Sequence, residues 1–311
     1  MSSSLDISSS SSSKVVTDPT FNDSKADVIL RSSDGIDFRM HKSLLSFAST
    51  FFEGMFDLPQ PASGSGDEVV DGLPVVRLPE NSQTLKQLLL FCHPAHAPQL
   101  QNLEEVHDVL GPAIKYDMMG AIKRIGQMLR GFTVDEPLRA FCIAWQYKLE
   151  EEVRFAAKHN LNRPMFPRTW VRELELITAG TLHRLEEYHF KCGKAAKAVA
   201  TSHTWIVHGS LIQFGAGCWK CSQGQSVSVT GGQIPARAWW TEYMQEAGNA
   251  LMEKPRGATV KSPELISKAL RKANECAQCR ERVFVEMTEF CELFAEQVEK
   301  VVSTMSLKVE F

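Results

Sequence analysis

The spacing of apolar residues changes at residue 41, from a period typical of strands to one typical of helices. Between residues 28 and 40 apolar and polar side chains largely alternate around an Asp-Gly pair, which predicts two strands joined by a tight turn. After His41 the apolar residues recur at three- and four-residue spacing as far as Phe56, which predicts a helical pair. A hairpin that runs into helices cannot close a core alone, so this segment requires further elements around it.

His41 stands at the join between the alternating and the helical segments. It could serve as a catalytic base or a metal ligand, but no carboxylate, thiol or second histidine lies at the short spacing that either role favours. The interpretation that we favour is a partly buried imidazole whose ring nitrogens bond backbone groups at the strand-to-helix corner. We therefore predict structural roles for His41 and for Asp27, at the start of the first strand.

The residues around this join resemble the core signature of BTB/POZ domains. The resemblance covers residues 27–130 and combines several side-chain types at fixed spacing with the predicted hairpin-to-helix context. The remainder of the chain looks like members of a large fungal, basidiomycete-type group of BTB proteins, whose C-terminal part is helical and carries cysteines. The signature residues are Asp27, His41, Lys42, Leu45, Ser49, Phe52, Met55 and Phe56.

The resemblance implies a protein–protein interaction module or adaptor rather than an enzyme. Such domains self-associate or dock a partner through a sheet edge and helices; some recruit a cullin-type ubiquitin ligase scaffold and others recruit transcriptional corepressors. Many of them have, where Ala48 stands here, an arginine that pairs at the dimer interface with the acidic residue matched by Asp27. The sequence FCHPAHAP at residues 91–98 also replaces the usual tyrosines and glycine. These departures argue against a charged-pocket dimer and weaken the expectation that a cullin is recruited.

Composition restricts the kinds of partner. The chain has 34 Lys and Arg against 37 Asp and Glu, so its net charge of −3 provides no basic field that would attract nucleic acid. It has no run of 18 apolar residues, no secretory signal pattern, no phosphate-binding glycine loop and no arrangement typical of a catalytic triad. We expect an intracellular protein, in the cytoplasm or nucleus, with protein partners that include a second copy of itself. We expect no direct nucleic-acid binding, no membrane contact and no small-molecule substrate.

The fold class predicted for the whole chain is α+β, with a short sheet flanked by helices followed by a mostly helical region. Thr133 and Glu136 are expected to cap a helix that has Pro137 in its first turn. A long amphipathic helix from Val283 to Met305 should place its glutamates, Glu286 among them, on the outer face. It could form a coiled coil between chains, but its heptads are not strict, so packing against the chain's own helices is favoured. The predicted parts are a disordered serine-rich tail at 1–20, a BTB/POZ domain at 21–131, a helical module at 132–200 and a C-terminal helical region with two Cys-x-x-Cys pairs at 201–311.

Four of the eight cysteines form two Cys-x-x-Cys pairs, Cys218 with Cys221 and Cys276 with Cys279. Two such pairs are what a tetrahedral structural zinc site needs, because each pair can chelate from one tight turn. The stretch between the pairs is long, but the entropy of loop closure grows slowly with length, so we predict a structural zinc. One alternative is four reduced thiols that never converge. Another is a thiol oxidoreductase in which a helix dipole lowers the pKa of a thiol, although the strand-helix-strand context of a thioredoxin-like fold is absent from the pattern.

Overall fold

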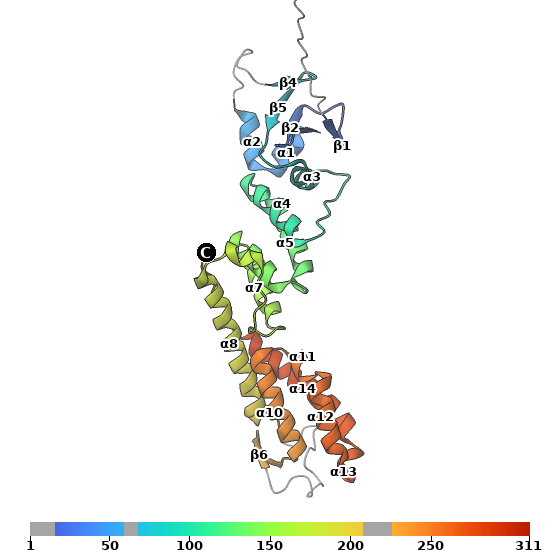
Figure 1. Ribbon diagram of the computed structural model, residues 1–311, viewed down its shortest axis with the longest axis vertical. Helices are drawn as coiled ribbons and strands as arrows, with labels where there is room; N and C mark the ends of the chain where they lie inside the picture. Colours follow the sequence, from blue (N-terminus) through green and yellow to red (C-terminus); the bar gives the residue numbers. More distant parts are fainter. Residues whose placement is uncertain (1–15, 59–67, 208–225) are drawn as a thin grey trace, which may run out of the picture. The chain divides into compact units, whose positions relative to one another are not determined.

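The computed structural model describes residues 16–58, 68–207 and 226–311, and the chain divides into two compact units (Figure 1). The first unit spans residues 1–132 and the second spans residues 133–311. The first combines a mixed sheet with helices, and the second is mostly helical, so the α+β class predicted from the sequence is confirmed. The serine tract lies outside the described residues, as do Cys218 and Cys221.

The sheet of the first unit has five strands in the order β1-β3-β2-β5-β4. The predicted hairpin is its centre, because β2 and β3 pair antiparallel, with Val28 opposite Met40. The next strand along, β5, pairs parallel with β2 and places Ile29 opposite Val75. The strands are β1 (Val16–Asn22), β2 (Val28–Arg31), β3 (Ile36–Met40), β4 (Val69–Val70) and β5 (Leu73–Arg77).

Strand β1 corrects the predicted extent of the disordered tail. It begins at Val16, inside the segment 1–20, and pairs parallel with β3. Phe21 on this strand is buried, with its ring centroid 5.6 Å from that of Phe38. The pairing partner lies about twenty residues away in the chain, and the local composition of residues 16–20 carries no sign of it. The correction therefore comes from tertiary pairing that composition does not encode.

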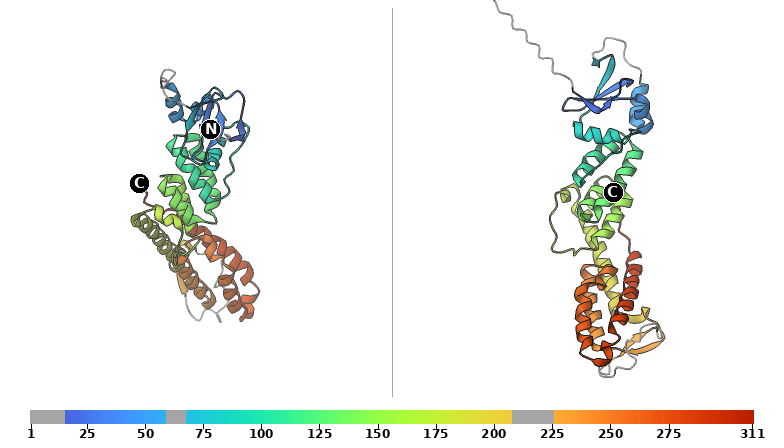
Figure 2. Two further views of the ribbon diagram at one scale, coloured as in Figure 1. Left: turned by 45° about the horizontal axis from the view of Figure 1, so that its top comes forward. Right: turned by 90° about the vertical axis from the view of Figure 1, so that its right-hand side faces the viewer.

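Three helices of the first unit, α2, α3 and α4, begin at polar side chains that accept a hydrogen bond from the first turn. Ser49 accepts from the amide of Phe52 at the start of α2, and Asn102 accepts from the amide of Glu105 at the start of α4. Asn81 caps α3 in the same way. Figures 1 and 2 agree that α4 and α5 lie on one side of the sheet. The helices are α1 (Lys42–Ala48), α2 (Thr50–Asp57), α3 (Ser82–Leu90), α4 (Leu103–Lys115) and α5 (Met119–Thr133).

The second unit is built from helices and one two-stranded ribbon. Helices α6 and α7 pack together, α8 packs along α10, and α14 packs on α8, α11 and α12. The long C-terminal helix therefore packs against the chain's own helices, as favoured from its irregular heptads. The elements are α6 (Pro137–Gln146), α7 (Glu150–Asn160), η1 (Arg172–Leu176), α8 (Ala179–Thr201), η2 (His203–Trp205), β6 (Ser226–Val229), β7 (Gly232–Pro235), α10 (Ala238–Glu253), α11 (Gly257–Val260), α12 (Pro263–Asn274), α13 (Ala277–Arg280) and α14 (Val283–Ser303).

Aromatic rings fill the core of the second unit. Phe290 on α14 is fully buried and lies 5.7 Å from Trp240 and 5.7 Å from Phe294, measured between ring centroids. Trp205 stacks on Phe294 from the other side at 5.6 Å. The helices approach closely at Gly193, where an added Cβ would meet the carbonyl oxygen of Met252 at 2.7 Å. Packing between α8 and α10 therefore requires glycine at this position.

Two details of the second unit differ from the sequence predictions. Thr133 is the last residue of α5 and does not cap α6, whose N-cap is Glu136 without a side-chain hydrogen bond, although Pro137 opens the helix as expected. Glu286 does not face outward from α14: it is buried and pairs with buried Arg237 at 3.1 Å. The arginine precedes α10, far from Glu286 in the chain, so helical periodicity gave no sign of this pairing.

Candidate functional site

Asp27 holds the corner at which the hairpin meets helix α1. Its backbone amide donates to the carbonyl oxygen of Met40 at 3.1 Å, which closes the hairpin end. Its carboxylate Oδ1 accepts from the backbone amide of Lys42 at 2.7 Å. Because Lys42 opens α1, Asp27 satisfies an amide that the helix itself leaves unpaired. The carboxylate thus acts as a cap supplied from another part of the chain.

His41 lies beside Asp27 and bonds a different group from the one predicted. Its Nε2 lies 3.0 Å from Oδ2 of Asp23, and its side chain is 32% exposed. The expected backbone partner is therefore replaced by a carboxylate that short sequence spacing did not indicate. A hydrogen bond from the amide of Lys25 and the bond to His41 together lower the pKa of Asp23. The pair joins the segment before β2 to the start of α1.

The remaining signature residues fasten α1 and α2 to the end of α4. Ser49 accepts from the amide of Phe52 at 3.0 Å and donates to the carbonyl oxygen of Tyr116 at 2.5 Å. Phe52 is fully buried and stacks on Tyr116 with ring centroids 5.1 Å apart. Lys42 places its ammonium 5.5 Å from the ring centroid of Phe56. Leu45 on α1 is fully buried, and Met55 on α2 is half-buried.

Comparison with known families agrees with this geometry. Residues 18–132 match the family model of the BTB/POZ domain. The first unit contains a BTB/POZ domain. No curated protein matches the chain.

The BTB domain also contains a buried ion cluster that sequence reasoning missed. Arg31 and Asp37 face each other across β2 and β3, with Nε to Oδ1 at 2.5 Å and Nη2 to Oδ2 at 2.9 Å. Glu68 makes a further ion pair with Arg31. Hydrogen bonds from Arg31 to Asp37 and Glu68 raise the pKa of the guanidinium. Opposite charges at paired positions of a predicted hairpin are the signal that could have revealed the cluster.

Two aromatic side chains of the BTB domain face solvent beside the signature residues. Phe47 on α1 is 95% exposed, and Phe51 on α2 is 46% exposed. The ring of Phe51 packs against that of Tyr116 with one side, and the two ring centroids are 5.3 Å apart. We call Phe47 and Phe51 the aromatic face. Sequence reasoning selected the inward apolar residues of this segment and overlooked these two, which are separated by four positions and lie outside the inward stripe.

The described cysteine pair of the second unit forms one tight turn. Cys276 is half-buried at the N-cap of α13, and Cys279 is fully buried. The amides of Cys279 and Arg280 both donate to the carbonyl oxygen of Cys276, at 3.1 and 3.0 Å. Such a turn suits two thiolates that chelate one ion. Within 16–58, 68–207 and 226–311, no three His, Cys, Asp or Glu side chains form a metal-binding group. Because Cys218 and Cys221 lie outside these ranges, the four-cysteine site stays a prediction.

The length and apolar content of the helices bear on whether any of them could span a membrane. Among the residues with a described structure, none of the helices combines the length and the apolarity needed to cross a bilayer.

Proposed function

We propose that the chain is a non-enzymatic adaptor whose BTB domain self-associates or docks a protein partner through the aromatic face. A BTB/POZ domain is a protein–protein interaction module, and the observation that carries the proposal is the 95% exposure of Phe47. Exposed phenyl rings on the consecutive helices α1 and α2 are unfavourable in water and are typical of an interaction surface. The aromatic face would therefore bind its partner through apolar contacts.

The environment of Asp27 supports association through this apolar contact rather than through a charged pocket. Ala48 follows Phe47 on α1 and offers no cation to Asp27. The carboxylate of Asp27 is instead bonded to the amide of Lys42 within the same chain. We therefore expect self-association to be weak and little affected by salt.

Light scattering across a dilution series tests the proposal on the full chain. The wild type should change from monomer to dimer in the micromolar range, and Phe47→Ser should weaken this association about tenfold, because a central exposed aromatic is lost. Phe284→Ser removes another exposed ring, 70% exposed, from the second unit and serves as the matched control. A wild-type chain that stays monomeric at high micromolar concentration would leave only heterotypic docking.

A cullin-type ubiquitin ligase adaptor is the narrower form of this function. The division of the chain into two compact units supports it, because an adaptor needs one surface for a scaffold and another for a substrate. Binding of purified cullin N-terminal domain, measured by calorimetry, tests it. The elements around Cys276 and Cys279 argue against the other alternative, a thiol oxidoreductase, because the pair lies between the helices α12 and α14 and not in a strand-helix-strand unit.

A structural zinc held by Cys218, Cys221, Cys276 and Cys279 remains our proposal for the C-terminal region, as does its likeness to the fungal BTB group. The tight turn at Cys276 and Cys279 supports the zinc site, and four thiolates would leave no open position for catalysis. Metal analysis of chelator-free protein should give about one zinc per chain. Cys276→Ser should lose this metal, whereas Cys92→Ser in the BTB domain should retain it. Less than half an equivalent in the wild type would contradict the site.

A further inference from the structure

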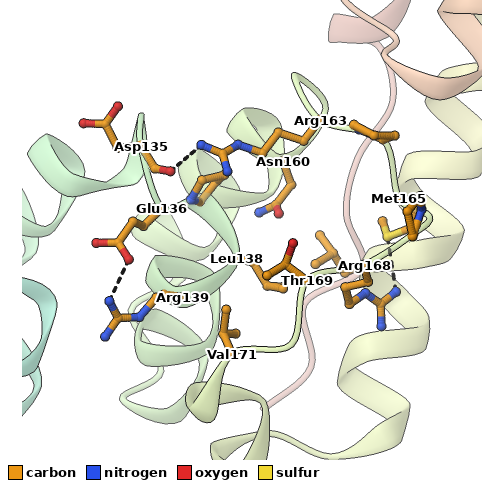
Figure 3. A pocket seen from close by; sticks show the side chains of 14 residues that line it. Asp135, Glu136, Leu138, Arg139, Asn160, Arg163, Met165, Arg168, Thr169 and Val171 are labelled. Atoms are coloured by element: carbon orange, nitrogen blue, oxygen red, sulfur yellow. Dashed lines mark hydrogen bonds and ion pairs between the residues drawn. The ribbon is translucent and has the colours of Figure 1, made fainter.

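A loop in the second unit separates two apolar hollows. The loop joins α7 to α8, and the first hollow, of about 370 Å³, lies between it and the start of α6 (Figure 3). The second hollow, of about 630 Å³, lies between the same loop, α8 and the end of α10. Pro164 and Met165 line both hollows, so the two form one continuous surface. We call this the two-hollow surface.

The loop between the hollows is held in place by neighbouring elements. Buried His189 on α8 bonds the carbonyl oxygen of Arg163 through Nε2 at 3.1 Å. Arg168 forms an ion pair with Glu186 on the same helix. The surface is therefore ordered before any partner arrives, which reduces the conformational entropy lost on binding.

Aromatic side chains are exposed along this surface. Phe166 is 68% exposed and Phe190 is 58% exposed, and both line the second hollow. Leu138, Val171 and Leu185 give the first hollow an apolar lining. Exposed aromatics beside apolar hollows are the features from which the strongest contacts of protein interfaces are built.

Each hollow is lined by a charged side chain that has no ion-pair partner among the described residues, and these two side chains are opposite in charge. Arg163 at the first hollow donates to the carbonyl oxygen of Asp135, and no carboxylate within the described ranges forms an ion pair with it. In Figure 3 the carboxylate of Asp135 points away from the hollow, and that of Glu136 points towards Arg139. Glu253 at the second hollow is exposed and, among residues with a described structure, has no basic partner. The surface thus offers a cation at the first hollow and an anion at the second.

We propose that the two-hollow surface binds an extended segment of a partner protein. The segment places an acidic side chain at Arg163, one apolar side chain in each hollow, and a lysine or arginine at Glu253. The volumes of the hollows fall within the range of about 300–1,000 Å³ found for ligand pockets. The opposite charges set the direction in which the segment lies. This site is distinct from the aromatic face of the BTB domain and does not depend on it.

A random peptide library displayed on phage, selected against the full chain, is the probe that tests the site. Enriched peptides should share the order acidic, apolar, apolar, basic. Synthesised and measured by fluorescence anisotropy, they should bind Phe166→Ser about tenfold more weakly than the wild type. Arg163→Glu and Glu253→Lys should each weaken binding by a similar factor, and a peptide whose acidic residue is replaced by lysine should recover affinity for Arg163→Glu.

Phe284→Ser is the matched control and should bind as the wild type does. All the changed side chains are exposed, so thermal melting should be unaltered; if Phe166→Ser melts lower, Phe190→Ser replaces it. The proposal is overturned if no peptide is enriched, or if the enriched peptides bind all three variants as tightly as the wild type. It is also overturned if the variants change the oligomeric state of the chain alone, because the surface would then bind a second copy.

Discussion

The BTB domain and the second unit are stabilised in different ways. The BTB domain depends on polar groups that are fully paired: the buried cluster of Arg31 with Asp37, and the caps at Asp27 and Ser49. The second unit depends on the volume of aromatic rings packed between long helices, with Phe290 at the centre. Each unit also contains the other kind of feature, since Phe52 is buried in the BTB domain and Arg237 pairs with Glu286 in the second unit. The difference therefore concerns which loss should cost each unit more, that of a charge partner or that of core volume.

The largest effect should come from a cavity in the second unit. Phe290→Ala removes a fully buried ring that contacts Trp240 and Phe294, and should lower the free energy of unfolding of this unit by about 3–5 kcal/mol. Chemical denaturation followed by tryptophan fluorescence and by circular dichroism measures it. Phe284→Ala, at an exposed position of the same helix, should change little. If the loss fell equally on the BTB domain, the contrast between the units would fail.

In the BTB domain, the largest loss of stability should come from leaving a buried charge without its partner. Asp37→Ala leaves Arg31 buried with Glu68 as its remaining acidic partner, and should cost about 3 kcal/mol. Replacing both partners, as in Arg31→Met with Asp37→Leu, should recover much of that loss, because no buried charge remains. Denaturant midpoints of the single and double variants decide the matter. A double variant less stable than Asp37→Ala would show that the stability at this site depends on side-chain volume and not on charge pairing.

A smaller effect is expected at the helix caps. Ser49→Ala removes an acceptor for the amide of Phe52 and a donor to the carbonyl oxygen of Tyr116, and should destabilise the BTB domain by about 1–2 kcal/mol. Ser43→Ala, at an exposed position of α1, is the control. Thermal melting of both variants measures the difference. Equal midpoints would mean that the fold tolerates an uncapped α2.

Mild acid should produce the smallest difference in stability between the two units. Burial lowers the pKa of His189 and of His203, both in the second unit, below the usual 6.5. As the pH falls below that value, the unfolded chain takes up protons before the folded unit does. The free energy of unfolding of the second unit should therefore fall by up to about 1 kcal/mol for each of these two histidines between pH 7 and pH 5.5.

The control for this pH effect is His189→Gln, which should flatten the dependence of the melting midpoint on pH. The BTB domain has one histidine with a lowered pKa, His93, which is half-buried, so its own response should be smaller. A BTB domain that responds to acid as steeply as the second unit would contradict this prediction.

Local pattern predicted the elements well and their long-range partners poorly. The hairpin at 28–40, the helical pair after His41 and the apolar face of the last helix are all found, because each depends on residues within a few positions. The ribbon of β6 and β7 was missed, although its apolar residues alternate around two glycines. The extent of β1 was missed because it is set by pairing with β3.

The candidate site shows the same limit. The signature residues could be selected from sequence because their types and spacing are fixed by a local corner. The bond between His41 and Asp23, the burial of Glu286 against Arg237 and the two hollows around Met165 all join segments far apart in the chain. Exposed apolar side chains such as Phe47 depart from the rule that places apolar residues inside, so periodicity assigns them no role.

The inward orientation of the signature residues has a consequence for how such proteins are recognised and how they diverge. Leu45, Ser49 and Phe52 are buried, and the carboxylate of Asp27 accepts a hydrogen bond at the start of α1. The motif by which the domain is detected therefore describes the fold and carries no information about the partner. Phe47, by contrast, is almost fully exposed, whereas Phe51 contacts Tyr116 with one side of its ring. If the aromatic face binds the partner as proposed, a substitution at position 47 changes the partner that is bound while a motif search still finds the same domain.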